Sequence, residues 1–153
     1  MSHADFSLRT LILISLLVLS GCRGHVGSVH VEGETQPRFR FVGTSIGSLV
    51  IYRIPRKYLN KNIPLDEITK ITPDTQWSVE GNHNVGIPIS YGSIPEGMKE
   101  VVPAKPLADN TVYFVSTYVN TEETGSFAGQ YFKIQNGRAI EVHGTVDEST
   151  VNN

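Results

Sequence analysis

The stretch that decides the fold is Val112-Tyr-Phe-Val-Ser-Thr-Tyr-Val-Asn120. Valine, threonine and aromatic residues favour extended structure, because branched and aromatic side chains pack well on a pleated sheet. The run is long enough for a complete strand, and polar residues flank it on both sides. It predicts a strand over residues 112–120, the strongest in the chain.

Shorter stretches on both sides of this run have the same extended character. In Arg38-Phe-Arg-Phe-Val42, charged and aromatic residues alternate, as in a half-buried strand. Pro88 limits a further strand to a sheet edge or a bulge. Asn136-Gly137 is typical of a tight hairpin turn. The remaining expected elements are strands at 49–54, 76–79, 85–91, 127–134 and 138–142, and one short helix at 64–71. Short strands separated by turns predict an all-β sandwich.

The residues that lead into the strongest strand resemble the tyrosine corner of immunoglobulin-like and fibronectin type III domains. In Leu107-Ala-Asp-Asn-Thr-Val-Tyr113, a leucine precedes by six positions a tyrosine that opens a strand. The resemblance implies an immunoglobulin-like (fibronectin III-like) β-sandwich. In it the Tyr113 hydroxyl bonds to the upstream backbone and fixes a crossover between the sheets, and Trp77 is the core tryptophan. The alternative is a chance spacing in an unrelated β-domain.

The N-terminal region carries the longest apolar run, Leu11-Ile-Leu-Ile-Ser-Leu-Leu-Val-Leu19, and the only cysteine, Cys22. At about 1.5 Å per residue the run is too short to cross about 30 Å of hydrocarbon as a helix. It has the length of the apolar part of a signal peptide, with Arg9 as its positive flank. A lone cysteine cannot form an internal disulfide, so Cys22 needs another explanation.

The sequence Leu19-Ser-Gly-Cys22 resembles the lipobox of bacterial outer-membrane lipoproteins. The resemblance implies that residues 1–21 are removed and that the Cys22 thiol receives a diacylglycerol. Cys22 then becomes the first residue and the lipid anchor. Arg23 follows where an aspartate would indicate retention in the inner membrane, which favours the periplasmic face of the outer membrane. The alternative, a buried cysteine at the end of a core helix, lacks an amphipathic pattern.

The rest of the chain is one domain of ordinary size. We assign residues 22–36 to the lipidated cysteine and a flexible tether, with a possible first strand at 28–32. Residues 37–143 are expected to form the sandwich, and residues 144–153 a polar tail. The net charge of −2 and the lack of a basic stripe predict no nucleic-acid partner.

One motif suggests catalysis. Gly43-Thr-Ser-Ile-Gly47 matches G-x-S-x-G, and Asp109 and His143 would complete a triad in the required chain order. A nucleophile elbow needs a helix behind the serine, however, and the residues after Gly47 are strand-like. We therefore expect a glycine-flanked turn between two strands and no enzymatic activity. The histidines beyond the signal peptide lack metal-ligand spacing, which predicts no metal site and no cofactor. They are His25, His30, His83 and His143.

Two groups of residues suggest binding. The first is a basic cluster that would contact phosphates or an acidic protein patch, or would simply be a solvated strand end. It comprises Arg53, Arg56, Lys57 and Lys61 with Tyr52 and Tyr58. The second is a loop over residues 91–98 with apolar members typical of protein interfaces. They are Tyr91, Ile94, Pro95 and Met98. The alternative for these four residues is that they plug one end of the sandwich.

The layout of the chain is similar to small periplasmic lipoproteins proposed as immunity proteins against type VI secretion toxins. The shared features are a lipobox, a short tether, a cysteine-free β-domain with one tryptophan, and Ile89-Ser-Tyr-Gly92 followed by a Pro-Gly loop. This resemblance implies a lipid-anchored protein-binding module that covers a toxin's active surface. The alternatives are an assembly lipoprotein that docks an envelope complex to the outer membrane and, more remotely, a serine hydrolase using Ser45.

Overall fold

The computed structural model describes residues 28–33, 36–59, 67–68, 70, 74–121 and 125–143. The predicted signal peptide, Cys22, His25, Lys61 and the predicted tail lie outside these residues. Of the helix predicted at 64–71, Glu67, Ile68 and Lys70 are described and are helical. The other residues of that segment lie outside the described part.

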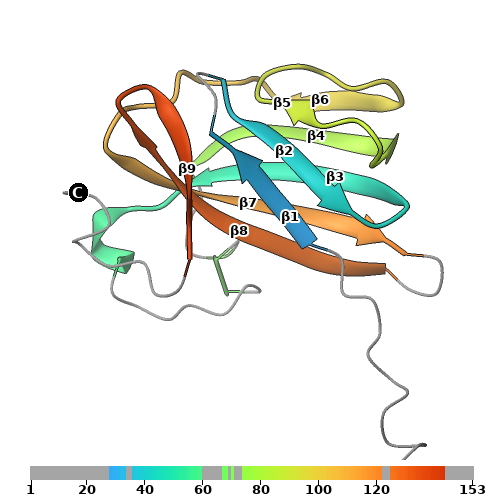
Figure 1. Cartoon of the computed structure of the whole chain (residues 1–153), viewed down its shortest axis with the longest axis horizontal. Coiled ribbons are helices and arrows are strands. Elements are labelled where there is room, and N and C mark those ends of the chain that lie inside the picture. The colour runs from blue at the N-terminus through green and yellow to red at the C-terminus, as the bar shows by residue number, and fades with distance from the viewer. Residues whose placement is uncertain are drawn as a thin grey trace, which may run out of the picture.

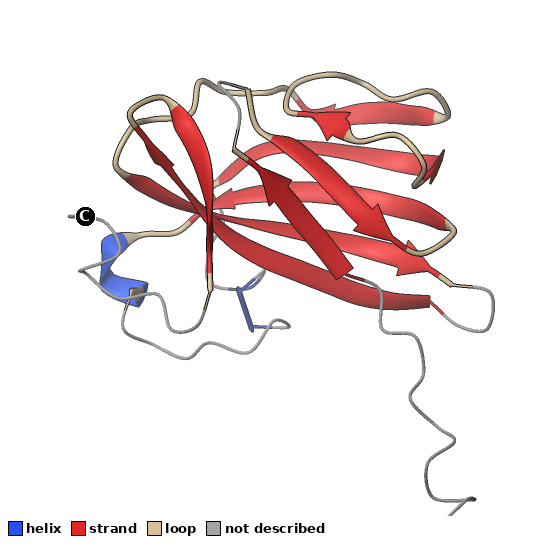
Figure 2. Ribbon diagram, viewed as in Figure 1, coloured by secondary structure: helices blue, strands red, loops and turns tan. Residues whose placement is uncertain are grey.

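The described residues form two antiparallel sheets that pack face to face (Figures 1 and 2). The smaller sheet has the strand order β1-β2-β5, and the larger has the order β6-β4-β3-β7-β8-β9. The strands are β1 (Ser28–Glu32), β2 (Arg38–Val42), β3 (Ser45–Arg53), β4 (Thr75–Asn84), β5 (Ile89–Ser90), β6 (Met98–Val102), β7 (Thr111–Asn120), β8 (Gly125–Gln135) and β9 (Arg138–Val142). A short 3-10 helix, η1 (Arg56–Tyr58), follows β3. The predicted all-β sandwich is confirmed.

The strongest predicted strand is the centre of the larger sheet. β7 pairs with β8 along its whole length and with β3 from Tyr113 to Asn120. The possible first strand is also present, because all five residues of β1 pair with β2. The sandwich therefore begins at Ser28 rather than at residue 37.

The strand predicted at 85–91 is largely wrong. β4 continues to Asn84, residues 85–88 form a turn, and only Ile89 and Ser90 pair with β2. Pro88 explains the late start, because proline has no N–H to donate to a neighbouring strand.

The main core lies between the two sheets and joins aromatic residues from both. Phe39 of β2 meets Phe132 of β8 edge to face at 5.8 Å, and Phe132 stacks on Tyr113 of β7 at 5.5 Å. Trp77 of β4 is fully buried, as predicted for a core tryptophan. Full burial of an apolar side chain of this kind contributes about 2–3 kcal/mol, so the aromatic cluster dominates the packing between the sheets.

A second, smaller core lies on the outer face of the larger sheet. The strand registers place Tyr52, Phe114, Tyr131 and Val142 in one row across β3, β7, β8 and β9. The segment after β3 covers this row with buried apolar side chains. They are Ile54, Leu59 and Ile68. This packing holds η1 and its basic residues against one end of the sheet.

The sandwich has two distinct ends (Figure 1). The turn end carries the β2–β3, β4–β5 and β7–β8 connections, because Ser45 lies opposite both Asn84 and Asn120. The helix end carries η1 and the β8–β9 turn. Ser45 and Arg53 are the two ends of β3, so about 26 Å separates them at about 3.3 Å per residue. β1 begins at the turn end, because Ser28 pairs with Val42.

Candidate protein-binding site

The loop predicted to bind a partner is anchored in the core by its first residue, Tyr91. Tyr91 is only 7% exposed, and its ring meets Trp77 edge to face at 5.3 Å. Its hydroxyl donates to the carbonyl oxygens of Gln76 at 3.2 Å and Lys105 at 2.8 Å. Burial raises the pKa of Tyr91 well above its usual range. Tyr91 therefore fixes the loop to β4, as the alternative interpretation expected.

The rest of this loop is largely exposed, with only Pro95 and Met98 half-buried. Met98 is partly buried against the main core. Ile94 is 54% exposed and Pro95 is half-buried. The loop is held to β4 where His83 Nδ1 lies 3.0 Å from the carbonyl oxygen of Glu96. Of the four predicted contact residues, Ile94 is exposed, Pro95 and Met98 are half-buried and Tyr91 is buried, so a role in binding stays a prediction.

The tyrosine of the predicted corner makes a local hydrogen bond. The hydroxyl of Tyr113 accepts from the backbone N–H of Ala108 at 2.8 Å, and Leu107 packs against the main core. Burial raises the pKa of Tyr113. The connection that this bond fixes runs from β6 to β7, which belong to the same sheet. It is therefore not the predicted crossover between sheets, and the immunoglobulin-like relationship stays a prediction.

The G-x-S-x-G motif forms a turn followed by a strand. Ser45 is the first residue of β3, and its hydroxyl accepts from the side-chain amide of Asn120 at 3.0 Å. Gly43 has a φ of 156°, and a Cβ there would come within 2.3 Å of Val119. The first glycine of the motif is thus explained by packing against β7.

The structure does not bring the three residues of the formal triad together. Ser45 lies opposite Asn120 at the end of β7, whereas Asp109 precedes the start of the same strand. The length of β7 separates them by about 30 Å at about 3.3 Å per residue. The Asp109 carboxylate accepts instead from the backbone N–H of Gly137 at 3.1 Å.

The described histidines do not form a metal centre. Within the described ranges, no group of three or more histidine, cysteine, aspartate or glutamate residues is placed to hold a metal ion. His30 and His143 each lie 3.5 Å from the carboxylate of Glu141. In the same part of the chain, no helix is long and apolar enough to cross a membrane.

The predicted basic cluster contributes two arginines to a pocket of about 390 Å³ at the helix end. Its lining comes from the end of β3, from η1 and from the start of β7. The lining residues are Arg53, Ile54, Pro55, Arg56, Leu59, Asp74, Asp109, Asn110, Thr111 and Val112. Ile54, Leu59 and Val112 belong to the second core, so a buried apolar floor lies beneath the arginines. We call this site the arginine pocket.

The two arginines of the pocket have unused hydrogen-bond donors. Over the described residues, neither Arg53 nor Arg56 has a hydrogen bond or ion pair through its guanidinium group. The pocket's acids already have partners, since Asp74 lies 3.4 Å from the Lys105 ammonium and Asp109 accepts from Gly137. Planar guanidinium groups bind carboxylates and phosphates through paired hydrogen bonds. The pocket can therefore accept an anionic group with an apolar stem.

The other described members of the basic cluster, Lys57, Tyr52 and Tyr58, do not line this pocket. The Lys57 ammonium lies over the ring of Tyr58, 4.9 Å from its centroid, in a cation–π contact. Tyr52 and Tyr58 pack against the second core. Sequence analysis found the two arginines from their local clustering. It missed the wall at residues 109–112, because only the pairing of β3 with β7 brings that wall to them.

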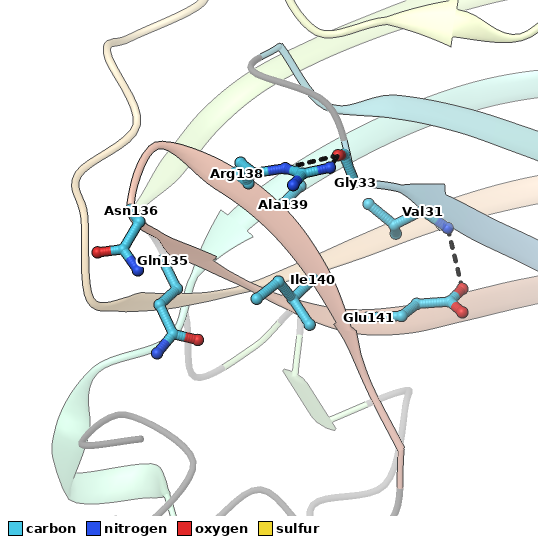
Figure 3. A pocket seen from close by; sticks show the side chains of 8 residues that line it. All are labelled: Val31, Gly33, Gln135, Asn136, Arg138, Ala139, Ile140 and Glu141. Atoms are coloured by element: carbon cyan, nitrogen blue, oxygen red, sulfur yellow. Dashed lines mark hydrogen bonds between the residues drawn. The ribbon is translucent and has the colours of Figure 1, made fainter.

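A second pocket, of about 500 Å³, separates β1 from β9 (Figure 3). Two of its lining residues are bonded to each other: Arg138 donates from Nε and one Nη to the carbonyl oxygen of Gly33, at 3.2 and 3.0 Å. The Glu141 carboxylate accepts from the backbone N–H of Val31 at 2.9 Å. The charged side chains of this pocket thus join the edges of the two sheets, so we interpret it as a structural joint.

Comparison with known proteins gives no relative from which a function could be transferred. No protein family matches the chain, and no curated protein or solved structure is significantly similar to it. A function is therefore inferred from the chemistry of the residues at the arginine pocket and from the sequence motifs.

Proposed function

We propose that this protein is a lipid-anchored protein-binding module on the periplasmic face of the outer membrane. Cys22 would carry the lipid, and the arginine pocket would receive an acidic side chain of a protein partner. The observation that supports binding is a pair of guanidinium groups over a buried apolar floor, neither of which is bonded to any residue that the structure describes. Arginine is enriched among the residues that dominate binding energy at protein interfaces.

The form of the pocket favours an acidic protein side chain over a nucleic acid. Two arginines with Asp74 and Asp109 beside them give a local charge pattern, not an extended basic stripe. Nucleic-acid binding needs many phosphate contacts over a basic face. A glutamate or aspartate on a partner loop needs only one or two guanidinium groups, and its aliphatic stem would contact Ile54 or Val112.

The particular function that we propose is immunity against a type VI secretion toxin. This step comes from the similarity of layout to such lipoproteins, namely the lipobox, the tether and the cysteine-free β-domain. The protein would neutralise the toxin by covering its active surface and would need no chemistry of its own. An assembly lipoprotein that docks an envelope complex remains the alternative, and the partner's identity separates the two.

The test is partner capture with matched charge variants. The full chain with a C-terminal tag is expressed in its native host and recovered from detergent-solubilised membranes, including after contact between sister cells. The wild type is compared with Arg53→Gln/Arg56→Gln. The control is Arg40→Gln/Lys99→Gln, which changes the net charge equally but removes exposed ion pairs to Glu32 and Glu80. Such pairs contribute about 1 kcal/mol or less.

We expect one secreted toxin to bind the wild type and the control, and its affinity for the pocket variant to fall at least 100-fold. Hydrogen bonds to charged groups contribute about 1.5–3 kcal/mol each, which supports this magnitude for two arginines. Recovery of envelope-complex subunits would favour the assembly role. Equal binding by all three proteins would show that the arginine pocket is not the binding site.

The lipid anchor has its own test. Cys22→Ala removes the only thiol, so we expect the variant to remain unprocessed and to incorporate no labelled fatty acid. Mass spectrometry of the N-terminal peptide reports both events. Processing and acylation equal to the wild type would contradict the assignment of Cys22.

A further inference from the structure

The turn end carries apolar side chains that neither core absorbs. Among the described residues, six large hydrophobic side chains are exposed, and they are Val42, Ile87, Ile94, Val101, Phe127 and Ile140. Val42, Ile87 and Phe127 lie next to the three connections of the turn end, with exposures of 50%, 69% and 64%. Half of the exposed apolar residues therefore gather at one end of the sandwich.

Backbone hydrogen bonds hold these three connections side by side. The N–H of Thr44, in the β2–β3 turn, donates to the carbonyl oxygen of Asn120 at 2.8 Å. The N–H of Val85, in the β4–β5 turn, donates to the carbonyl oxygen of Thr44 at 3.4 Å. The β2–β3 turn therefore lies beside both the β4–β5 turn and the end of β7.

We propose that this turn end rests on the lipid bilayer, with Val42 and Ile87 in contact with the membrane interface. The inference depends on the proposed lipid anchor at Cys22. Phe127, whose ring meets Tyr118 edge to face at 5.1 Å, is on the outer face of the larger sheet and is not part of this contact.

The position of β1 carries the argument. Ser28 lies directly opposite Val42, so the chain enters the sandwich at the turn end. Cys22 is six positions earlier, and six residues span at most about 20 Å even when fully extended. A lipid on Cys22 would therefore hold Val42 near the headgroups. The arginine pocket lies at the far end of β3, directed away from the membrane.

The proposed contact is apolar and does not depend on anionic lipids. Isolated exposed aliphatic and aromatic side chains suit the boundary between headgroups and acyl chains. We therefore expect the contact to form whether or not the vesicles contain anionic lipid.

The experiment uses the acylated full chain reconstituted in phosphatidylethanolamine–phosphatidylglycerol vesicles. Acylation blocks the Cys22 thiol, so a second cysteine can be labelled alone with an environment-sensitive fluorophore. The test positions are Val42→Cys and Ile87→Cys. The control is Lys57→Cys on η1, at the helix end. Lipids brominated on the acyl chain quench a label only where it touches the membrane.

We expect quenching of at least half of the fluorescence at positions 42 and 87 and almost none at position 57. A chain that floats with the vesicles but shows equal quenching at positions 87 and 57 overturns this inference alone. A protein partner that covers position 87 would also overturn the inference. The label would then report an apolar environment without being quenched by the brominated lipid. A chain that is not acylated and does not float overturns the proposed anchor as well.

Discussion

At the scale of single residues, the buried tyrosines tie loops to strands. Tyr113 bonds to a backbone group five positions upstream, so its sequence spacing was enough to predict the contact. Tyr91 bonds to the backbone 14 and 15 positions away, and local sequence presented it as an interface residue. Tyrosine suits both environments, because it combines an apolar ring with a polar tip. Only the packing of the loop on Trp77 decides between them.

Replacing Tyr113 by phenylalanine should destabilise the sandwich. The change leaves the N–H of Ala108 without its acceptor in a partly buried place, which costs about 1–2 kcal/mol. Urea unfolding measures the loss. Tyr118→Phe is the control, because the Tyr118 hydroxyl forms no hydrogen bond with any described residue. Equal loss in both variants would contradict a specific role for the Tyr113 bond.

Stability should fall at alkaline pH. Burial raises the pKa of Tyr52, Tyr91, Tyr113 and Tyr131 in the folded state. The unfolded chain then releases these protons first, at about pH 10, so the folded state loses stability as the pH rises above that value. Urea midpoints between pH 7 and 11.5 should decline above about pH 10.

The same series with Tyr91→Phe separates the contribution of one tyrosine. We expect a lower midpoint at pH 7, because the bonds to Gln76 and Lys105 are lost, and a shallower decline above pH 10. An unchanged alkaline slope would show that Tyr91 ionises equally easily in both states.

At the scale of elements, side chains join the two sheets at the edge where β1 lies beside β9, because no backbone pairing connects these strands. β1 and β9 belong to different sheets, and Arg138 and Glu141 supply the groups that a neighbouring strand would otherwise provide. Arginine and glutamate in a short strand look like solvated surface residues in a sequence. Their backbone partners lie more than 100 positions away, so no local pattern could reveal the joint.

The joint can be tested by hydrogen exchange. Glu141→Ala should leave the N–H of Val31 without its acceptor, and the exchange rate of that amide should rise at least tenfold, while the amides that pair β7 with β8 stay protected. His143→Ala serves as the control, because it removes only an exposed side chain at 3.5 Å from the same carboxylate. Unchanged exchange at Val31 in Glu141→Ala would contradict the joint.

The strands themselves were largely predictable, for a physical reason. Where one face of a strand is buried, polar and apolar residues alternate along it, as in β2. β7 is buried on both faces, and its valine, threonine and aromatic residues made it predictable instead. β4 ends in Glu-Gly-Asn-His-Asn84, which has no apolar residue, so its outer half was missed. That half is held by pairing with β3 and β6. Of the arginine pocket, the sequence predicted the two arginines, because they are close together in the chain. It did not predict the wall at residues 109–112, which is more than 50 positions away from them.

At the scale of the whole molecule, the two ends of the sandwich differ in chemistry. The turn end carries the exposed apolar side chains of Val42 and Ile87 next to the start of β1, whereas the helix end carries Arg53 and Arg56, whose guanidinium groups bond to none of the described residues. Such an arrangement suits a domain that is anchored at one end and binds a partner at the other. The proposed partner binding and the proposed membrane contact are assigned to opposite ends of the sandwich.

The central claim is that a protein partner binds at the arginine pocket. The most direct measurement is photo-crosslinking in cells from a photoreactive amino acid at position 57, beside the pocket, with position 99 on β6 as the control. The account predicts that one partner is captured from position 57, on a segment that contains aspartate or glutamate. It also predicts that Arg53→Gln/Arg56→Gln abolishes the product. No product at position 57, or the same products from both positions, would contradict the account.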